Sequence, residues 1–287
     1  MLAKEGPAME SCSLCQGLGV VFSPRVSVAE AAVCECARHC TICRDTGYLF
    51  ERDAQGREQA QKCQCERRRV CVRLYNEAKV PGKYYDALLS SRYQDRNNQD
   101  AFHTFKMLAK EFHPGHKGIV LMGPAGVGKT WLIAAFIREL IFTHGTPMLF
   151  RDFFHLLSDL KSGYSRDIPE SDLIDPLVGV EVLVIDELGK GRNTPWEQNI
   201  LDVIISQRYN ARKTTIFTTN YTVDRKKTLI EKHRPRELAE GDSFKEVKDT
   251  LVDRVGTRIY SRLKEMCDFI PIAGPDRRGE DLAPRSI

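Results

Sequence analysis

The residues with the clearest chemistry lie between positions 123 and 130, where the chain reads GPAGVGKT and matches the phosphate-binding loop pattern G-x-x-x-x-G-K-[ST]. Glycines in such a loop let successive backbone N–H groups converge on phosphate oxygens, the lysine adds positive charge at the outer phosphates, and the final hydroxyl reaches Mg²⁺. The sequence therefore predicts a site for a nucleoside triphosphate, formed by Gly123, Pro124, Ala125, Gly126, Val127, Gly128, Lys129 and Thr130.

Hydrolysis needs an acid that holds the metal and a group that orients water, and the pair Asp186–Glu187 follows the apolar run Val182–Ile185. Ligands gather at the carboxyl ends of strands in parallel sheets. We expect Asp186 to act on Mg²⁺, directly or through water, and Glu187 to polarise the attacking water. A buried strand capped by a surface acidic pair is the alternative, and the phosphate loop upstream disfavours it.

A further polar group, Asn220, ends the β-branched segment Lys213–Thr219. If this segment is a strand beside the phosphate loop, the Asn220 side chain can hydrogen-bond the γ-phosphate or the attacking water. An asparagine at a strand end is also a common turn former, so this role depends on its neighbours. The chain has neither the N-K-x-D motif of GTPases nor the L-S-G-G-Q motif of transporter ATPases, which disfavours both classes.

Eight of the ten cysteines form a duplicated pattern near the N-terminus, in the order C-x-x-C, C-x-C, C-x-x-C, C-x-C. The second copy repeats the first at an offset of 28 residues that becomes 29 after one inserted residue. Four thiolates suit a closed tetrahedral Zn²⁺ site, so we expect two structural zinc ions. Their ligands would be Cys12, Cys15, Cys34, Cys36, Cys40, Cys43, Cys63 and Cys65.

Spacing alone leaves the pairing of these thiolates open. Pairing within each copy is the simpler arrangement, but the first copy, C-S-L-C-Q-G-L-G, also resembles the zinc repeat of DnaJ-type chaperones, whose sites join non-adjacent repeats. Redox or disulfide cysteines and iron–sulfur ligation are lesser alternatives. Closed zinc sites do not catalyse, so the module is expected to present a surface to a partner.

The elements that position these groups can be read from the pattern of apolar residues. The run Gly118–Met122 predicts a strand before the phosphate loop, and Trp131–Phe142 predicts a helix after it, whose N-terminal dipole favours an anion. A glycine-rich turn that binds nothing would lack both flanks. The length of 287 residues suggests about two domains.

Composition sets few limits on partners. The formal net charge is +4, and basic clusters such as Arg67–Arg69 and Arg225–Lys227 permit a nucleic-acid partner without requiring one. The sequence has no apolar run of signal-peptide or membrane-span length, so we expect a cytoplasmic protein that does not bind a membrane.

Four segments, read in order, carry a resemblance: GPAGVGKT, VLVIDELG, TTIFTTN and DRVGTRIYSRLKEMC. Together they resemble the AAA+ ATPases of the DnaC and IstB type, which are bacterial replicative helicase loaders and transposition helpers. The resemblance covers roughly residues 80–278. It implies ATP and Mg²⁺ as cofactors, Asp186 and Glu187 as the Walker B pair, and Asn220 as the sensor 1 residue.

The fold class that follows is α/β: a three-layer P-loop AAA+ domain with a parallel sheet and no C-terminal helical lid, preceded by a small zinc-ribbon-like β module. We expect a duplicated zinc-binding module over residues 1–66, a helical connector over 67–100, the AAA+ ATPase domain over 101–278 and a tail over 279–287.

Arginines near the end of the resemblance have expected roles in assembly. In the family the S-R-L type segment carries an arginine finger that acts on the nucleotide of a neighbouring subunit, which implies Arg262, with Arg258 as second candidate, and self-association through the ATPase domain. Without the resemblance, Arg254, Arg258 and Arg262 would be one basic helix face that contacts nucleic acid or solvent. Arg277 or Arg278 could serve as sensor 2.

The segment of residues 151–164 is expected to line a path for single-stranded DNA, as in the related loaders. Single-strand binding needs cations and aromatic planes, so Lys161, Ser162 and Tyr164 are the candidate DNA contacts. The helical spacing of four apolar residues predicts that they face the core instead: Phe153, Phe154, Leu157 and Leu160.

The function most consistent with these observations is an ATP-dependent helicase loader that binds the replicative DNA helicase, through the zinc module, and single-stranded DNA during replication. One alternative is an IstB-like transposition helper ATPase that acts with a transposase on duplex DNA. Another is a zinc-dependent adaptor that uses ATP as a slow switch.

Overall fold

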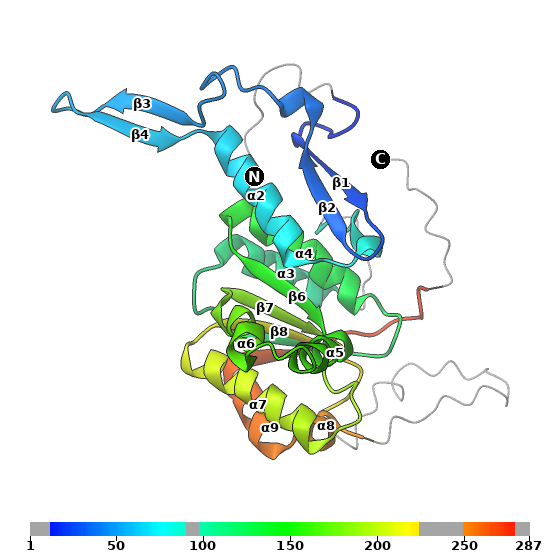
Figure 1. The fold of residues 1–287 in the computed structure, drawn as a ribbon. Helices are drawn as coiled ribbons and strands as arrows, with labels where there is room; N and C mark the ends of the chain where they lie inside the picture. Colours follow the sequence, from blue (N-terminus) through cyan, green and yellow to red (C-terminus); the bar gives the residue numbers. More distant parts are fainter. Residues whose placement is uncertain (1–11, 90–97, 224–248, 279–287) are drawn as a thin grey trace. The chain divides into compact units, whose positions relative to one another are not determined.

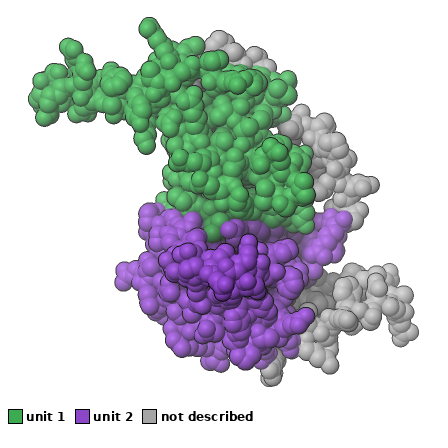
Figure 2. All heavy atoms as spheres, in the orientation of Figure 1, with its two compact units in different colours: residues 1–90, 106–112, 131–149 green, residues 91–105, 113–130, 150–287 purple. Residues whose placement is uncertain are grey.

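The computed structural model of the chain describes residues 12–89, 98–223 and 249–278. The chain forms two compact units, shown in Figure 2. Unit 1 comprises residues 1–90, 106–112 and 131–149, and unit 2 comprises residues 91–105, 113–130 and 150–287. The predicted tail over 279–287 and the basic cluster Arg225–Lys227 lie outside the described residues.

Unit 1 contains the duplicated cysteine pattern as two antiparallel hairpins (Figure 1). The first pairs β1 (Val20–Pro24) with β2 (Ala29–Val33), and the second pairs β3 (Tyr48–Arg52) with β4 (Glu58–Lys62). Gly19 and Gly47 precede the two hairpins at φ of +67° and +78°, a conformation that favours glycine. A β module with two copies of one hairpin is therefore what the sequence pattern predicted.

A helix continues unit 1 directly from the last cysteine pair. Helix α2 (Gln64–Ala78) ends at Lys79, whose left-handed φ of +59° stops the helix. The predicted boundary at residue 66 falls inside α2, and the one at residue 100 falls inside α3 (Gln99–Glu111), so the division into domains remains a proposal. The short 3₁₀ turns are η1 (Glu35–Ala37) and η2 (Gly82–Tyr84).

Unit 2 is built on a five-stranded sheet in the order β6-β7-β8-β5-β9. The pairs β7–β8, β8–β5 and β5–β9 are parallel, which confirms the predicted parallel α/β sheet. Every residue of β7 and β8 is buried, as expected for central strands covered on both faces. The strands are β5 (Gly118–Met122), β6 (Met148–Asp152), β7 (Val182–Asp186), β8 (Thr214–Thr219) and β9 (Cys267–Pro271).

Helices connect these strands. Helix α7 begins with Pro195 after a reciprocal capping box between Thr194 and Glu197, a strong start signal. From β9 to Arg278, the last described residue, the backbone forms no further helix. None of the described helices is long and apolar enough to cross a membrane. The helices are α4 (Lys129–His144), α5 (Phe153–Tyr164), α6 (Glu170–Gly179), α7 (Pro195–Asn210), α8 (Leu251–Val255) and α9 (Thr257–Met266).

A buried arginine ties helix and strand ends together in unit 2. Arg208 of α7 is fully buried, and its guanidinium donates to Thr215 Oγ1 at 2.8 Å and to the carbonyls of Leu177 and Val180 at 2.9 and 2.8 Å. It also donates to the Thr214 carbonyl at 2.6 Å. Because carbonyls at the end of α6 and before β7 would otherwise be unpaired, Arg208 fixes where these elements meet.

Candidate nucleotide-binding site

The GPAGVGKT loop joins β5 to the N-terminus of α4, as its flanks predicted. Gly126 and Gly128 have φ of +82° and +101°, which other residues rarely adopt. A Cβ on Gly123 would lie 2.2 Å from the carbonyl oxygen of Ile272. The three glycines are therefore required by backbone conformation or by close approach of another segment.

Lys129 is held inside this loop with 7% of its surface exposed. Its Nζ donates to the carbonyls of Gly123 and Pro124 at 2.7 and 2.6 Å and to Asn220 Oδ1 at 2.6 Å. Burial lowers the pKa of Lys129 to about 8, although the carboxylates of Asp186 and Glu187 oppose the shift. The predicted strand-end Asn220 and the loop lysine therefore meet in one site.

The Thr130 hydroxyl donates to both carboxylate oxygens of Asp186, at 3.2 and 3.0 Å. Asp186 also accepts from the Thr218 hydroxyl on the neighbouring strand. Burial raises the pKa of Asp186, and a nearby divalent cation would reverse this shift. A buried carboxylate beside a hydroxyl is an oxygen donor set that suits Mg²⁺, so the residues present fit the predicted metal.

Glu187 follows the end of β7 in a left-handed conformation, with φ of +57°. Its backbone N–H donates to Thr218 Oγ1 at 2.8 Å, and its carboxylate pairs with Lys190. A non-glycine residue in this conformation is strained, and such strain is common at functional sites. The carboxylate that was predicted to polarise water is thus half-buried and already paired with a cation.

A later segment of the chain lies against the phosphate loop. The N–H of Ile272 donates to the Met122 carbonyl at 2.7 Å, and the N–H of Arg277 donates to the Gly126 carbonyl at 3.1 Å. A Cβ on Gly126 would lie 2.0 Å from the Asp276 carboxylate. The charge of Arg278, a sensor 2 candidate, lowers the pKa of Lys129.

The arginine-finger candidates lie on α9 and face α7. Arg262 Nη1 donates to Asp202 Oδ1 at 2.6 Å, and Arg258 Nη1 lies 3.6 Å from Asp202 Oδ2. The side chain of Arg262 is 22% exposed and that of Arg258 is 73% exposed. Among the described residues, no hydrogen bond or ion pair connects Arg262 to the phosphate loop, so the structure does not bring it together with Lys129.

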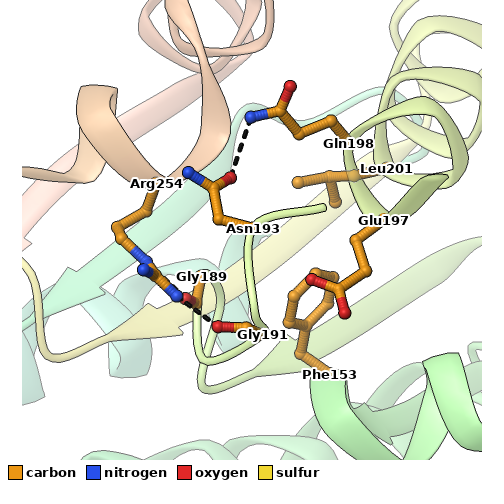
Figure 3. Close-up of a pocket in the computed structure, with 8 residues that line it drawn as sticks. All are labelled: Phe153, Gly189, Gly191, Asn193, Glu197, Gln198, Leu201 and Arg254. Carbon is orange, nitrogen blue, oxygen red and sulfur yellow. Dashed lines mark hydrogen bonds between the residues drawn. The ribbon is translucent and has the colours of Figure 1, made fainter. Parts of the chain in front are cut away.

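Arg254 has a role that sequence reasoning missed. Its Nε donates to the Gly189 carbonyl at 2.9 Å, and another guanidinium nitrogen donates to the Gly191 carbonyl. The guanidinium lies 5.3 Å from the centre of the Tyr221 ring. Figure 3 shows Arg254 reaching the loop that follows Asp186 and Glu187, beside a small pocket. No local signal gives this contact, because 63 residues separate Arg254 from Gly191.

The predicted DNA residues all lie at the C-terminal end of α5. Lys161 and Ser162 are exposed, with Lys161 Nζ 4.7 Å from the centre of the Trp196 ring. Tyr164 is half-buried, and its ring packs edge-to-face with the Trp196 ring, with the two ring centres 6.2 Å apart. The core prediction was wrong for Phe154, which is 55% exposed, whereas Phe153, about 100° away around α5, is buried.

The eight cysteines form two groups, each drawn from one copy of the repeat. All sulfurs within a group lie within 4.8 Å of one another. The contacts between the C-x-x-C and C-x-C halves are 3.4 to 3.8 Å, close to the separation of about 3.8 Å expected for sulfurs bound to one Zn²⁺. The groups are Cys12, Cys15, Cys34 and Cys36, and Cys40, Cys43, Cys63 and Cys65.

Comparison with known proteins gives consistent matches. The family model for IstB-like ATP binding proteins matches residues 56–234. The replicative helicase loader DnaC of Buchnera aphidicola (Acyrthosiphon pisum strain) is 29% identical over 127 residues, or 44% of this chain and 51% of that protein. DnaC of Escherichia coli K12 is 25% identical over 140 residues, which are 48% of this chain and 57% of that protein. The chain thus spans about half the length of these curated relatives.

Solved structures agree with the fold. The DnaC helicase loader is 27% identical with a TM-score of 0.54, over 67% of this chain and 99% of that one. DnaI is 25% identical with a TM-score of 0.51, over 68% and 93%. DnaA from Aquifex aeolicus shares the fold, with a TM-score of 0.50 and 15% identity. The match covers 65% of this chain and 50% of that chain. The AAA+ resemblance found in the sequence is confirmed.

Proposed function

Because this chain belongs to the family of IstB-like ATP-binding proteins, we propose that it is an ATP-dependent loader that binds the replicative DNA helicase and single-stranded DNA during replication. Family membership implies ATPase activity. The observation that carries the loader function is the match to a DnaC helicase loader over 99% of that chain.

The geometry supports a separate role for each polar residue around the nucleotide. Lys129 would exchange its contact with Asn220 for the outer phosphates, and Thr130 with Asp186 would hold Mg²⁺, which neutralises charge on the phosphates. Glu187 would leave Lys190 and accept a proton from the attacking water. Asn220 would then be free to orient that water or the γ-phosphate.

The arginine that completes the site is proposed to come from a neighbouring subunit. Arg262 and Arg258 share Asp202 within their own subunit, and contact with a neighbour's nucleotide would compete with this pairing. Hydrolysis would then depend on self-association through the ATPase domain, while ATP binding would not.

Single-stranded DNA is proposed to contact the exposed end of α5. Lys161 and Ser162 supply a cation and a hydroxyl for the DNA backbone, and the half-buried Tyr164 supplies an aromatic ring. The cysteine module, with zinc in its two groups, is proposed to bind the helicase.

A transposition helper remains the alternative, because the matching family model is that of IstB-like proteins. Such a protein would use the same nucleotide site with a transposase and duplex DNA. The adaptor alternative uses the site as a slow switch, and stimulated turnover separates it from both motors.

The test is to mix the purified chain with a replicative helicase hexamer and to measure complex formation and ATP turnover with single-stranded and duplex DNA. A loader forms the complex, and single-stranded DNA stimulates its ATP turnover. Stimulation by duplex alone without helicase binding supports the transposition helper and contradicts the loader. Helicase binding with no stimulated turnover identifies the adaptor.

A further inference from the structure

The two copies of the cysteine repeat differ in what covers their hairpins. In the first copy, the Phe22 ring packs edge-on against Tyr75 and Phe142, with centroid distances of 5.1 and 5.5 Å. The guanidinium of Arg138 lies 3.6 Å from the centre of the same ring. Phe50 occupies the equivalent position 28 residues later and is 68% exposed. One copy is therefore docked within unit 1, and its duplicate is not.

The backbone of the first hairpin is also recognised. Ala31 is the cross-strand neighbour of Phe22. Its N–H donates to Asn76 Oδ1 at 2.7 Å, and its carbonyl accepts from Asn76 Nδ2 at 3.0 Å. A single carboxamide of α2 thus pairs with the free edge of β2, as a neighbouring strand would. Docking of the first copy uses one aromatic ring and one backbone edge.

The second hairpin has the same aromatic ring and the same backbone edge, at equivalent positions of its strands. Phe50 pairs across the strands with Ala60, as Phe22 pairs with Ala31. The turn bond from Asp53 N–H to the Arg57 carbonyl, 3.0 Å, corresponds to the one that closes the first hairpin. Because ladder bonds alternate from the turn, Ala60 is in a non-hydrogen-bonded pair and its N–H and carbonyl point outward.

Nothing in the described part of unit 1 covers this second surface. All five residues of β4 are exposed, and no hydrogen bond among the described residues joins Ala60 to a group outside its hairpin. Tyr48, two residues before Phe50 on the same strand face, is 43% exposed. Figure 2 shows the β3–β4 hairpin as an arm that stands away from the rest of unit 1. An exposed pair of aromatic rings on a projecting hairpin is typical of a binding surface.

We propose that the β3–β4 hairpin docks on a pair of helices of a partner protein in the way that the β1–β2 hairpin docks on α2 and α4. Phe50 enters an aromatic pocket beside a cation, and the backbone of Ala60 pairs with a side-chain amide. In the part of a second copy that the structure describes, the pocket between Tyr75 and Phe142 is filled by that copy's own Phe22, which disfavours self-association through this hairpin. The partner is the replicative helicase, and this identification rests on the function proposed above.

The test measures the affinity of the full chain for the helicase hexamer by biolayer interferometry, with ATP present and DNA absent. Phe50→Ala is expected to weaken binding at least about tenfold, since buried aromatic anchors carry much of the binding energy of an interface. The matched control is Phe154→Ala, which removes an aromatic ring of similar exposure from unit 2 and should leave the affinity unchanged.

A second variant tests the backbone edge. Ala60→Pro removes an N–H that the hairpin itself does not use, and proline is tolerated on an exposed edge strand. It is expected to weaken helicase binding while the chain keeps its bound metal and its circular dichroism spectrum.

The outcomes separate the two proposals. Weaker binding by Phe50→Ala with an unchanged Phe154→Ala supports the docking arm. Equal binding by Phe50→Ala and the unsubstituted chain overturns the arm and leaves the loader function standing. No helicase binding by the unsubstituted chain overturns the loader function and, with it, this inference.

Discussion

At the scale of single residues, the buried Lys129 should couple the proposed nucleotide binding to the uptake of a proton. Its pKa in the free protein is lowered to about 8 by burial, and a bound triphosphate would raise the pKa again by supplying negative charge. Binding should therefore take up a proton near this pH, and ATP affinity should fall as pH rises through 8. Isothermal titration calorimetry in buffers of different ionisation enthalpy measures this proton uptake.

The control for this prediction is Lys129→Arg, which stays charged over the same range. Its ATP affinity, although weaker, should change little between about pH 7 and about pH 9 beyond the dependence of ATP itself. Proton uptake of equal size in both proteins would show that another group is responsible.

Glu187 gives a second prediction at this scale. Glu187→Gln keeps the size of the side chain but cannot accept a proton from water, so stimulated hydrolysis should fall by at least about a hundredfold while ATP binding persists. Turnover with helicase and DNA, measured beside ATP affinity, checks both parts. Lys190→Met serves as the comparison, because it removes the ion pair and keeps the carboxylate. Intact turnover in Glu187→Gln would assign the role to another group.

At the scale of elements, the number of zinc ions bound per chain tests how the eight cysteines are paired into metal sites. Zinc release by a thiol reagent should yield two ions per chain, one for each group of four cysteines. The double variant Cys12→Ser/Cys34→Ser should retain one ion, because both residues belong to one group. Crossed pairing between copies would lose both ions instead. Cys71→Ser, a buried cysteine outside both groups, should retain two.

Arg208 gives an element-scale prediction about stability. Arg208→Ala leaves several buried carbonyls without donors where α6, α7 and β8 meet, so the free energy of unfolding should fall by about 3–5 kcal/mol. Urea denaturation measures the change. Arg52→Ala, in an exposed ion pair, should change the free energy by less than about 1 kcal/mol. A small effect at Arg208 would mean that water replaces its hydrogen bonds.

At the scale of the whole molecule, the proposed dependence on self-association can be separated from ATP binding. ATPase activity per chain should rise with protein concentration, whereas ATP affinity should not. Arg258→Ala should abolish stimulated turnover at unchanged affinity and stability, if this largely exposed arginine is the finger. If the finger is Arg262, Arg262→Ala is the inactive variant, and it should also be less stable because it loses the closer pair with Asp202. Turnover that is independent of concentration would contradict assembly.

Local patterns predicted the parts of this molecule that depend on local chemistry. The loop before Lys129, the strand that ends at Asp186 and the grouped cysteines each follow from short-range spacing. The sequence did not predict contacts formed by distant segments. Asp276 beside Gly126 and Arg254 at Gly191 arise only when the sheet brings those segments together. Helical spacing in fact separates Phe153 from Phe154, because Leu157 and Leu160 follow Phe153 at four and seven residues and so share its face. The prediction that both rings face the core overlooked this difference.

The left-handed backbone of Glu187 has a consequence for attempts to stabilise this protein. A non-glycine residue in that conformation costs about 1 kcal/mol, so the chain keeps glutamate at a position where glycine or asparagine would fit the backbone better. A library selected for heat resistance alone should therefore enrich replacements at position 187 that fold well and no longer hydrolyse ATP. Selection for thermostability would need an activity screen beside it, because the backbone at position 187 favours glycine or asparagine whereas the proposed hydrolysis needs the glutamate.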